Sequence, residues 1–276
     1  MGFIEVRFNI EPMAPARDIL IAELSEIGYD SFVEDEDGLK AYIEGNEFDN
    51  AKIRSLHVMQ DHHFNISFDH GDMPDTNWNA EWEKNYEAIE IGDRIRVRAS
   101  FHKPSDKFKY EVHIDPRMSF GTGHHSTTRL MLGHAVDMPL TEKDVLDMGC
   151  GTAVIAILAK MRGARTVLAI DIDENSVRNS QENIALNAVE IDVQKGGAEC
   201  LKGLHFDVIF ANINRNVLLE DMPHYVEALN SGGTLLMSGF YKQDIAAIKE
   251  KADSCGMEFL SKAQELDWCF LEFVKR

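Results

Sequence analysis

The chain has 276 residues, of which 44% are hydrophobic, so it can bury a sizeable core and has a comfortable length for two domains. Its formal net charge of −19 argues against a nucleic-acid-binding surface, because such a surface is basic. No apolar run approaches the roughly 20 residues needed to cross a bilayer, so the sequence predicts no membrane-spanning helix.

The first residues contain neither a basic segment nor a long apolar stretch, so no signal peptide is predicted. The four cysteines show no paired spacing. Reduced thiols in a cytoplasmic protein are therefore the simplest interpretation.

Residues 1–70 predict a small α+β domain. Its strand segments alternate between apolar and polar residues, and the Asp37-Gly38 pair is a strong hairpin signal. The order of its elements, βαββαβ, is typical of a ferredoxin-like sandwich. In chain order, the expected elements cover residues 3–10, 15–28, 30–35, 39–45, 50–56 and 63–69.

The charge of the chain is concentrated at its start. Residues 1–50 contain 13 acidic and three basic side chains, which gives a net charge of −10. Such a segment would attract a basic protein partner. An ordinary solvated acidic surface is the other interpretation, and both stay open on the sequence alone.

Residues 71–90 are predicted to form a linker followed by a short helix. Trp78, Trp82 and Tyr86 recur in this stretch at helical spacing. Aromatic packing between domains is the favoured interpretation, ahead of a cage for a substrate.

Residues 91–276 predict a doubly wound α/β domain. Paired strands are expected around Gly92-Asp93, and from about residue 115 strands and helices alternate. Because ligands bind at the carboxyl ends of the strands in such sheets, we expect the functional residues there. Buried strands are expected at 145–148, 166–171, 190–194, 206–211 and 233–238, with two final strands at 256–262 and 268–275. Helices are expected at 126–137, 152–162, 173–187, 216–230 and 242–255.

The segment 145–173 carries the strongest functional signal. A buried strand leads into a turn with Gly149 and Gly151, a helix follows, and the next strand ends at Asp171. Glycine lets the backbone approach a ligand where a Cβ would clash. The spacing of about 20 residues between Gly151 and Asp171 is typical of a turn and its ribose-binding acid.

The type of nucleotide ligand follows from the glycine pattern. A nicotinamide or flavin site needs G-x-G-x-x-G, and here Val154 occupies the third glycine position. The pattern D-x-G-x-G-x-G, typical of S-adenosylmethionine enzymes, fits better, because Asp147, Gly149 and Gly151 match and Ala153 replaces the last glycine. The segment resembles the cofactor half of class I methyltransferases.

A second informative segment covers residues 115–132. Gly121 and Gly123 bracket Thr122, and a helix is expected to begin at Ser126. Hydroxyl groups at a helix start can cap the helix or bind a ligand, and both interpretations stay open. His124 and His125, directly before this helix, lack a matching cluster of carboxylates or cysteines, so we predict no metal site.

A third segment, residues 206–218, contains a buried strand that ends in Asn212. An asparagine carbonyl at this edge can accept a hydrogen bond from an amine and aim its lone pair. The alternative interpretation is an ordinary turn asparagine.

Together these motifs resemble those of the ribosomal protein L11 methyltransferase family. They stand in this chain as DPRMSFGTGHHSTT, DMGCGTAVIAI, AIDIDE, ANINR and SGF. The resemblance is clear over residues 78–276 and extends to the N-terminal domain by layout only. The chain departs from the family pattern at several positions. Arg117 and Ala153 replace glycine, His124 replaces threonine, Ser126 replaces proline, and Asn214-Arg215 replace Leu-Ala.

The resemblance implies a set of site residues. Asp171 would hold the ribose hydroxyls of S-adenosylmethionine, Gly149 would let its methionine part lie against the turn, and Asn212 would position the substrate amine. The cofactor-binding positions that it implies are Phe120, Gly121, Thr122, Thr128, Gly149, Gly151, Asp171 and Asn212.

The resemblance also implies methyl transfer to lysine ε-amines and the N-terminal α-amine of ribosomal protein L11, with the N-terminal domain recognising the substrate. We expect a monomer that acts on this protein free of the ribosome, without direct contact to nucleic acid or membrane. The alternatives are a class I methyltransferase acting on another protein, a nucleic-acid base or a small molecule, and a non-catalytic cofactor-binding module. Base-directed enzymes often carry two prolines and an aromatic residue after the asparagine, and Ile213-Asn214-Arg215 has none of them.

Overall fold

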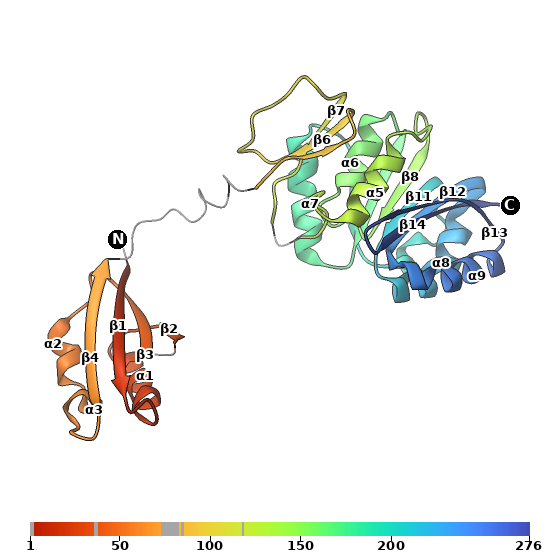
Figure 1. Ribbon diagram of the computed structural model, residues 1–276. Helices are drawn as coiled ribbons and strands as arrows, with labels where there is room; N and C mark the ends of the chain where they lie inside the picture. Colours follow the sequence, from red (N-terminus) through yellow and green to blue (C-terminus); the bar gives the residue numbers. More distant parts are fainter. Residues whose placement is uncertain (1–2, 36–37, 73–82, 84–85, 118) are drawn as a thin grey trace. The chain divides into compact units, whose positions relative to one another are not determined.

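The computed structural model shows two compact units, Met1–Asn85 and Tyr86–Arg276, here called the N-terminal and C-terminal units (Figure 1). The division between them lies within residues 71–90. Trp78 and Trp82 of the predicted linker helix lie outside the described residues. The residues that the structure describes are 3–35, 38–72, 83, 86–117 and 119–276.

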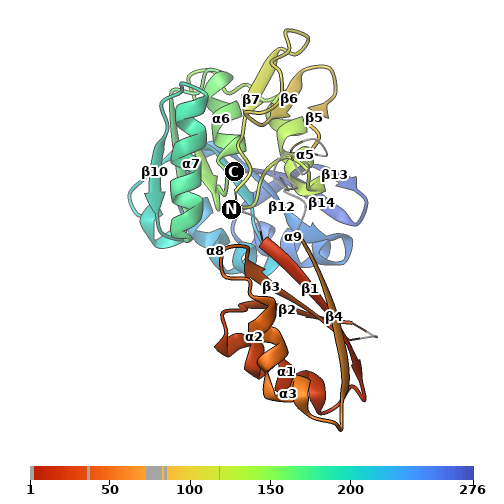
Figure 2. The ribbon, with the colours of Figure 1, turned by 90° about the vertical axis from the view of Figure 1, so that its left-hand side faces the viewer.

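The N-terminal unit is an antiparallel sheet, in the order β2-β3-β1-β4, with its helices on one face (Figure 2). In β1, Val6, Phe8 and Ile10 are buried while Arg7 and Asn9 between them are exposed, as expected for a half-buried strand. Its elements are β1 (Phe3–Glu11), α1 (Ala16–Glu26), β2 (Ser31–Glu34), β3 (Gly38–Glu44), α2 (Asn50–Ser55), α3 (His57–Gln60) and β4 (Asn65–Asp72).

The predicted ferredoxin-like arrangement and its hairpin are confirmed, although Asp37 itself is outside the described residues. Most boundaries lie within one or two residues of the prediction, and two differences have a clear structural cause. The helix predicted at 50–56 ends at Ser55, because Leu56 has an extended backbone, and a short helix that was not predicted, α3, follows it. The last strand runs over Asn65–Asp72 rather than 63–69, because it pairs with β1 along its whole length.

The C-terminal unit is built on a seven-stranded sheet in the order β10-β9-β8-β11-β12-β14-β13. The first five strands in this order are parallel, and β14 and β13 are antiparallel to their neighbours. The strands are β8 (Asp144–Met148), β9 (Thr166–Asp171), β10 (Asp192–Lys195), β11 (Phe206–Asn212), β12 (Leu229–Tyr241), β13 (Met257–Glu265) and β14 (Trp268–Lys275). The helices are α5 (Ser126–Ala135), α6 (Val154–Met161), α7 (Glu174–Leu186), α8 (Arg215–Ala228) and α9 (Ile245–Ser254).

Helices cover both faces of this sheet, which confirms the predicted doubly wound domain (Figure 1). One hydrophobic cluster packs α5, α6 and α7 on the sheet, and a second packs α8 and α9 on the other face. The central strands β8 and β11 are therefore buried on both sides, and residues 208–211 of β11 form a continuous apolar run. Their carboxyl ends, at Met148 and Asn212, reach the same edge of the sheet.

A small sheet precedes this domain, formed by β5 (Ile89–Ile91), β6 (Ile95–Arg98) and β7 (Tyr110–His113). The pair β5–β6 is antiparallel around Gly92-Asp93, as predicted, and β7 joins β6 in parallel. Among the helices in the described ranges, none combines the length and the apolar character needed to cross a membrane.

Candidate functional site

A cavity of about 470 Å³ opens at the carboxyl ends of the parallel strands. Met148 at the end of β8, Asp171 at the end of β9 and Asn212 at the end of β11 all line it. The glycine turn after β8 forms another part of the wall. Segments that are far apart in the sequence therefore meet where the topology of a doubly wound sheet places a ligand.

The glycine turn lies against neighbouring segments so closely that no side chain fits. Gly149 and Gly151 have φ angles of +70° and +54°, in the left-handed region. A Cβ on Gly151 would lie 2.2 Å from the carbonyl oxygen of Phe120, and a Cβ on Gly149 would lie 2.2 Å from Cγ2 of Ile213. The Thr152 N–H donates to the same Phe120 oxygen at 2.9 Å, which holds the turn against the loop before α5.

Asp171 joins the end of β9 to the glycine turn. Its Oδ2 accepts a hydrogen bond from Gly151 N–H at 2.9 Å, and its Oδ1 accepts one from Asp173 N–H at 3.0 Å. The carboxylate is only half-buried and lines the cavity, so its remaining lone pairs can accept bonds from a ligand. Asp171 therefore fits a ligand that carries hydroxyl groups, such as a ribose.

Ile172, which the sequence reading missed, lies on the cavity wall next to Asp171. It is 74% exposed, an unusual state for an isoleucine. A flat apolar ligand group beside the ribose would cover it. The only sequence signal for this role was an apolar residue directly after a strand-end acid.

Three buried polar atoms near the cavity have no hydrogen-bond partner among the described residues: Oδ1 of Asn212, Oγ1 of Thr128 and Oδ1 of Asp147. Buried polar atoms are nearly always satisfied in folded proteins, so the oxygen of Asn212, which lines the cavity, points to a ligand that supplies a donor. Burial raises the pKa of Asp147 to about 7, although its other oxygen accepts a hydrogen bond from Ala156 N–H.

The structure brings five of the predicted site residues together on the cavity wall: Phe120, Gly149, Gly151, Asp171 and Asn212. The other three, Gly121, Thr122 and Thr128, are not among the residues that line it. Gly121 lies next to Thr152, whose hydroxyl donates a hydrogen bond to the carbonyl oxygen of Gly121 at 2.7 Å. The Thr122 hydroxyl contacts Nδ1 of His124 at 3.1 Å.

Thr128 is fully buried within α5, and its neighbour Thr127 is the hydroxyl residue on the wall. Both threonines belong to the helix start that the sequence singled out, and the cofactor contact predicted for Thr128 remains a prediction.

Four rings at the mouth of the cavity form a cluster that we call the aromatic rim, defined as Phe120, His125, Trp268 and Tyr241. The ring centroids are 5.1 Å apart for Phe120 and His125, 4.6 Å for His125 and Trp268, and 4.3 Å for Trp268 and Tyr241. Phe120, His125 and Trp268 also line the cavity. Of these four residues only Phe120 was predicted as a site residue, because β14 and the end of β12 meet α5 only in the folded chain.

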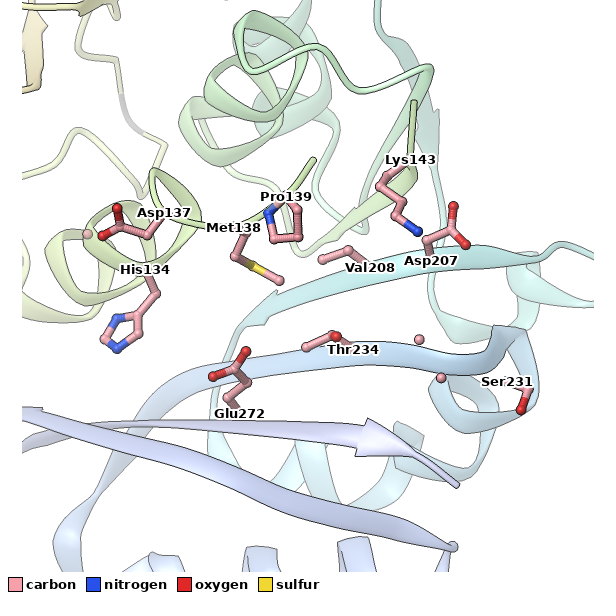
Figure 3. A pocket seen from close by; sticks show the side chains of 13 residues that line it. His134, Asp137, Met138, Pro139, Lys143, Asp207, Val208, Ser231, Thr234 and Glu272 are labelled. Carbon is pink, nitrogen blue, oxygen red and sulfur yellow. The ribbon is translucent and has the colours of Figure 1, made fainter. Parts of the chain in front are cut away.

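A larger cavity, of about 530 Å³, lies at the opposite edge of the sheet, beside the first residues of β8, β11 and β12 (Figure 3). Its position at the amino ends of the strands is not where a doubly wound sheet binds its ligand. The carboxylates that line it already have partners within the protein. These are the pairs Asp137–Arg94, Asp207–Asn230 and Glu272–Ser261. We therefore assign the functional site to the smaller cavity.

Within the described residues, no group of three or more histidine, cysteine or acidic side chains is placed to hold a metal ion. The two neighbouring histidines before α5 have separate roles. His124 contacts the backbone oxygen of Glu87 at 3.1 Å, whereas His125 belongs to the aromatic rim.

The comparisons with known proteins agree with this geometry. The family model for ribosomal protein L11 methyltransferase (PrmA) matches residues 13–276. A ribosomal protein L11 methyltransferase from Phocaeicola vulgatus is 46% identical over 283 residues, which cover 100% of this chain and 100% of the relative. A second, from Chlorobaculum tepidum, is 34% identical over 90% of this chain and 88% of the relative.

Among solved structures, a ribosomal protein L11 methylase from Lactobacillus delbrueckii subsp. bulgaricus is similar, with a TM-score of 0.64 and 28% identity. The match covers 69% of this chain and 100% of that one. A methyltransferase from Pyrococcus furiosus has a TM-score of 0.51 and 20% identity over 59% of this chain and 88% of its own, which shows a shared fold.

The close approach at Gly151 generates a direct test. Gly151→Ala should destabilise the protein by more than the roughly 1–2 kcal/mol cost of a left-handed alanine, because the new methyl group also meets a backbone oxygen. Gly92→Ala is the matched control, since Gly92 has a φ of +58° and no atom within 4 Å of its Cβ position. Urea denaturation followed by circular dichroism gives both free energies of unfolding. Equal losses in the two variants would contradict the close approach.

Proposed function

Because the chain belongs to the ribosomal protein L11 methyltransferase family, we propose that it transfers methyl groups from S-adenosylmethionine to amines of ribosomal protein L11. The amines are lysine ε-amines and the N-terminal α-amine. The observation that carries the proposal is the cavity in which a glycine turn, Asp171 and Asn212 meet.

The residues of the cavity fit S-adenosylmethionine part by part. Asp171 would hold the ribose hydroxyls, and Ile172 would cover one face of the adenine. The turn at Gly149 and Gly151 leaves room for the methionine chain against the backbone, because a Cβ at either position would clash. When bound, the cofactor supplies a sulfonium whose methyl group is electrophilic.

The substrate amine must arrive as a neutral nucleophile in line with that methyl group. Oδ1 of Asn212 has no partner among the described residues, so it can accept a hydrogen bond from the amine and aim its lone pair. A free lysine has a pKa of about 10.4. The site must therefore select the neutral form or let the ammonium lose its proton to water.

We propose that the N-terminal unit recognises the protein substrate. It has a hollow lined by Glu26, Glu47 and Asp49, with Phe48 and Lys52 beside them. These three carboxylates are exposed, and ribosomal proteins are generally basic because they neutralise RNA phosphate. The charge of the first fifty residues supports a recognition role for a basic partner. We further propose a monomer that acts on ribosomal protein L11 free of the ribosome.

The ribose contact can be tested with Asp171→Ala, which should weaken S-adenosylmethionine binding by roughly 1.5–3 kcal/mol, because charge-assisted hydrogen bonds are lost. Asp173→Asn is the matched control. It removes a nearby charge but keeps the cap of α7, since asparagine also accepts from the Ser176 N–H. Isothermal titration calorimetry measures both affinities, and an equal loss in both variants would refute the ribose role of Asp171.

The transfer itself can be tested by the incorporation of radiolabelled methyl groups into unmethylated ribosomal protein L11. Asn212→Ala should lower kcat by roughly 10- to 100-fold, with a smaller effect on cofactor affinity, because the amine is no longer aimed. Asn175→Ala, which changes an exposed asparagine in α7, is the control. Label that entered ribosomal RNA but not ribosomal protein L11 would favour the base-directed alternative, and the absence of any transfer would favour a binding module.

The recognition role predicts a salt-dependent association rate. Reversing Glu26 and Glu47 to lysine should slow association with ribosomal protein L11 several-fold at low salt, and the difference should shrink at high salt, where charges are screened within about 8–10 Å or less. Glu190→Lys with Glu250→Lys makes the same change of net charge in the C-terminal unit. Stopped-flow fluorescence measures the rates. If the two double variants were slowed equally, net charge and not the hollow would attract the partner.

A further inference from the structure

One side of α7 carries asparagines at intervals of four residues. They are Asn179, Asn183 and Asn187, and we call them the asparagine ladder. The first two lie within α7, and Asn187 directly follows its last residue. Residues four apart lie one above the other on a helix, so the three amides form a row. Asn179 and Asn183 are buried in the C-terminal unit.

Two members of the ladder hold the chain segment that leaves β7. Oδ1 of Asn187 accepts a hydrogen bond from His113 N–H at 2.8 Å, and its Nδ2 donates to the carbonyl oxygen of His113 at 2.6 Å. Oδ1 of Asn183 accepts from Asp115 N–H at 3.0 Å, and its Nδ2 donates to the carbonyl oxygen of Thr152 at 3.1 Å. The ladder therefore joins this segment to the glycine turn of the cavity.

The third member of the ladder makes no such bond. Asn179 is 3% exposed, and neither its Oδ1 nor its Nδ2 has a hydrogen-bond partner among the described residues. The hydroxyl oxygen of Ser119, in the loop that continues the segment, is also buried without a partner there. Folded proteins rarely leave buried polar atoms unsatisfied, so an amide with two such atoms calls for a functional explanation.

The register of the two formed contacts identifies the missing partner of Asn179. From one contact to the next, the segment advances by two residues and the helix by four. Two extended residues cover about 6.6 Å and four helical residues about 6.0 Å, so one further step brings the backbone of Arg117 opposite Asn179. Pro116 has no N–H group and disfavours a helical conformation in the residue before it, which preserves this spacing.

The side chain of Arg117 already lies against the same helix. Its Nη2 is 3.3 Å from Oε2 of Glu182, which follows Asn179 by three residues. Arg117 stands where the family pattern has glycine, so this ion pair is a departure of the present chain. Both side chains are exposed, and such surface pairs contribute little to stability. The pair keeps the segment beside α7 without satisfying the buried amide.

We propose that Asn179 is a positioning residue for the cofactor, whose amide closes onto the backbone of Arg117 when S-adenosylmethionine occupies the cavity. Oδ1 of Asn179 then accepts from the N–H of Arg117 and Nδ2 donates to its carbonyl oxygen, as Asn187 does with His113. The inference rests on the proposed function and goes beyond it, because it couples the cofactor to a helix residue outside the cavity wall.

Phe120 connects the cavity to this segment. It follows Arg117 by three residues and lines the cavity, and its carbonyl oxygen accepts from Thr152 N–H in the glycine turn. A ligand that touches Phe120 and the turn restrains the segment, so less conformational entropy is lost when the last contact forms. By linkage, that contact strengthens cofactor binding in return.

The first test separates Asn179 from its neighbour in the ladder. Without cofactor, Asn179→Ala should change the urea midpoint far less than Asn183→Ala, because only Asn183 has partners to lose. In isothermal titration calorimetry, Asn179→Ala should weaken S-adenosylmethionine binding about 3- to 30-fold, because the closed form loses up to two hydrogen bonds. An unchanged affinity, or a loss of stability without cofactor equal to that of Asn183→Ala, would overturn the inference.

Glu182→Gln is the control for the surface ion pair. It removes the partner of the Arg117 side chain but leaves the Arg117 backbone free to meet Asn179. The affinity for S-adenosylmethionine should therefore stay within about two-fold of the wild type, since an exposed pair contributes little. If Glu182→Gln weakened binding as much as Asn179→Ala, the side chain of Arg117 and not its backbone would hold the segment.

Hydrogen exchange observes the closing contact itself. In protein labelled with ¹⁵N-arginine, the amide signal of Arg117 is the one that disappears in Arg117→Lys. S-adenosylmethionine should slow exchange of this N–H about 10-fold or more in the wild type and not in Asn179→Ala, because only the wild type supplies an acceptor.

The inference and the proposed function fail in different ways. If the wild type bound no S-adenosylmethionine in the calorimeter, the proposed function would be wrong. If it bound the cofactor but exchange at Arg117 did not slow, a buried water and not the backbone of Arg117 would satisfy Asn179, and the inference would be wrong.

Discussion

The contact between the Gly151 backbone and the carbonyl oxygen of Phe120 is the constraint on which the rest of the site depends. The glycine turn approaches this oxygen more closely than any residue with a Cβ could. One side of the contact carries Phe120 and, a few residues on, His125 of the aromatic rim. The other side carries the N–H group that Asp171 binds. Ribose acid, glycine turn and rim are therefore held in one arrangement by two backbone segments, and a shift of either segment would move all three.

The fold was predictable where burial on both faces leaves an unambiguous pattern. In β11, Val208, Ile209 and Phe210 form an unbroken apolar run that only a central parallel strand requires. The boundaries were less predictable because partner strands decide them. The strand predicted at 233–238 extends from Leu229 to Tyr241, since Leu229 pairs with Phe206 of β11 and Tyr241 pairs with Trp268 of β14. Gly232 and Gly233 lie near the start of this strand, and such a pair of glycines ordinarily indicates a turn.

Within the site, the sequence identified residues whose type the backbone demands. Gly149 and Gly151 are required by their left-handed φ angles and close contacts, and Asp171 is marked by its spacing from the turn. Residues whose place in the site depends on contacts between distant segments were not predicted. Trp268 reaches the cavity only because β14 folds back antiparallel beside β12, a pairing that no local pattern in the sequence records.

Two departures from the family pattern have different physical consequences. Ala153 adopts a φ of +63°, which costs roughly 1–2 kcal/mol for a residue with a Cβ, yet its methyl group is fully buried and its N–H still bonds Cys150. That cost stays local. Arg215 instead introduces a long-range charge near the mouth of a cavity proposed to accept cationic amines. Coulombic repulsion acts over several ångströms, so the charge must be neutralised where it stands. Asp244 does so with Oδ1 and accepts a hydrogen bond from Tyr241 N–H with Oδ2, so the charge of Arg215 is balanced by a carboxylate that the end of β12 holds in place.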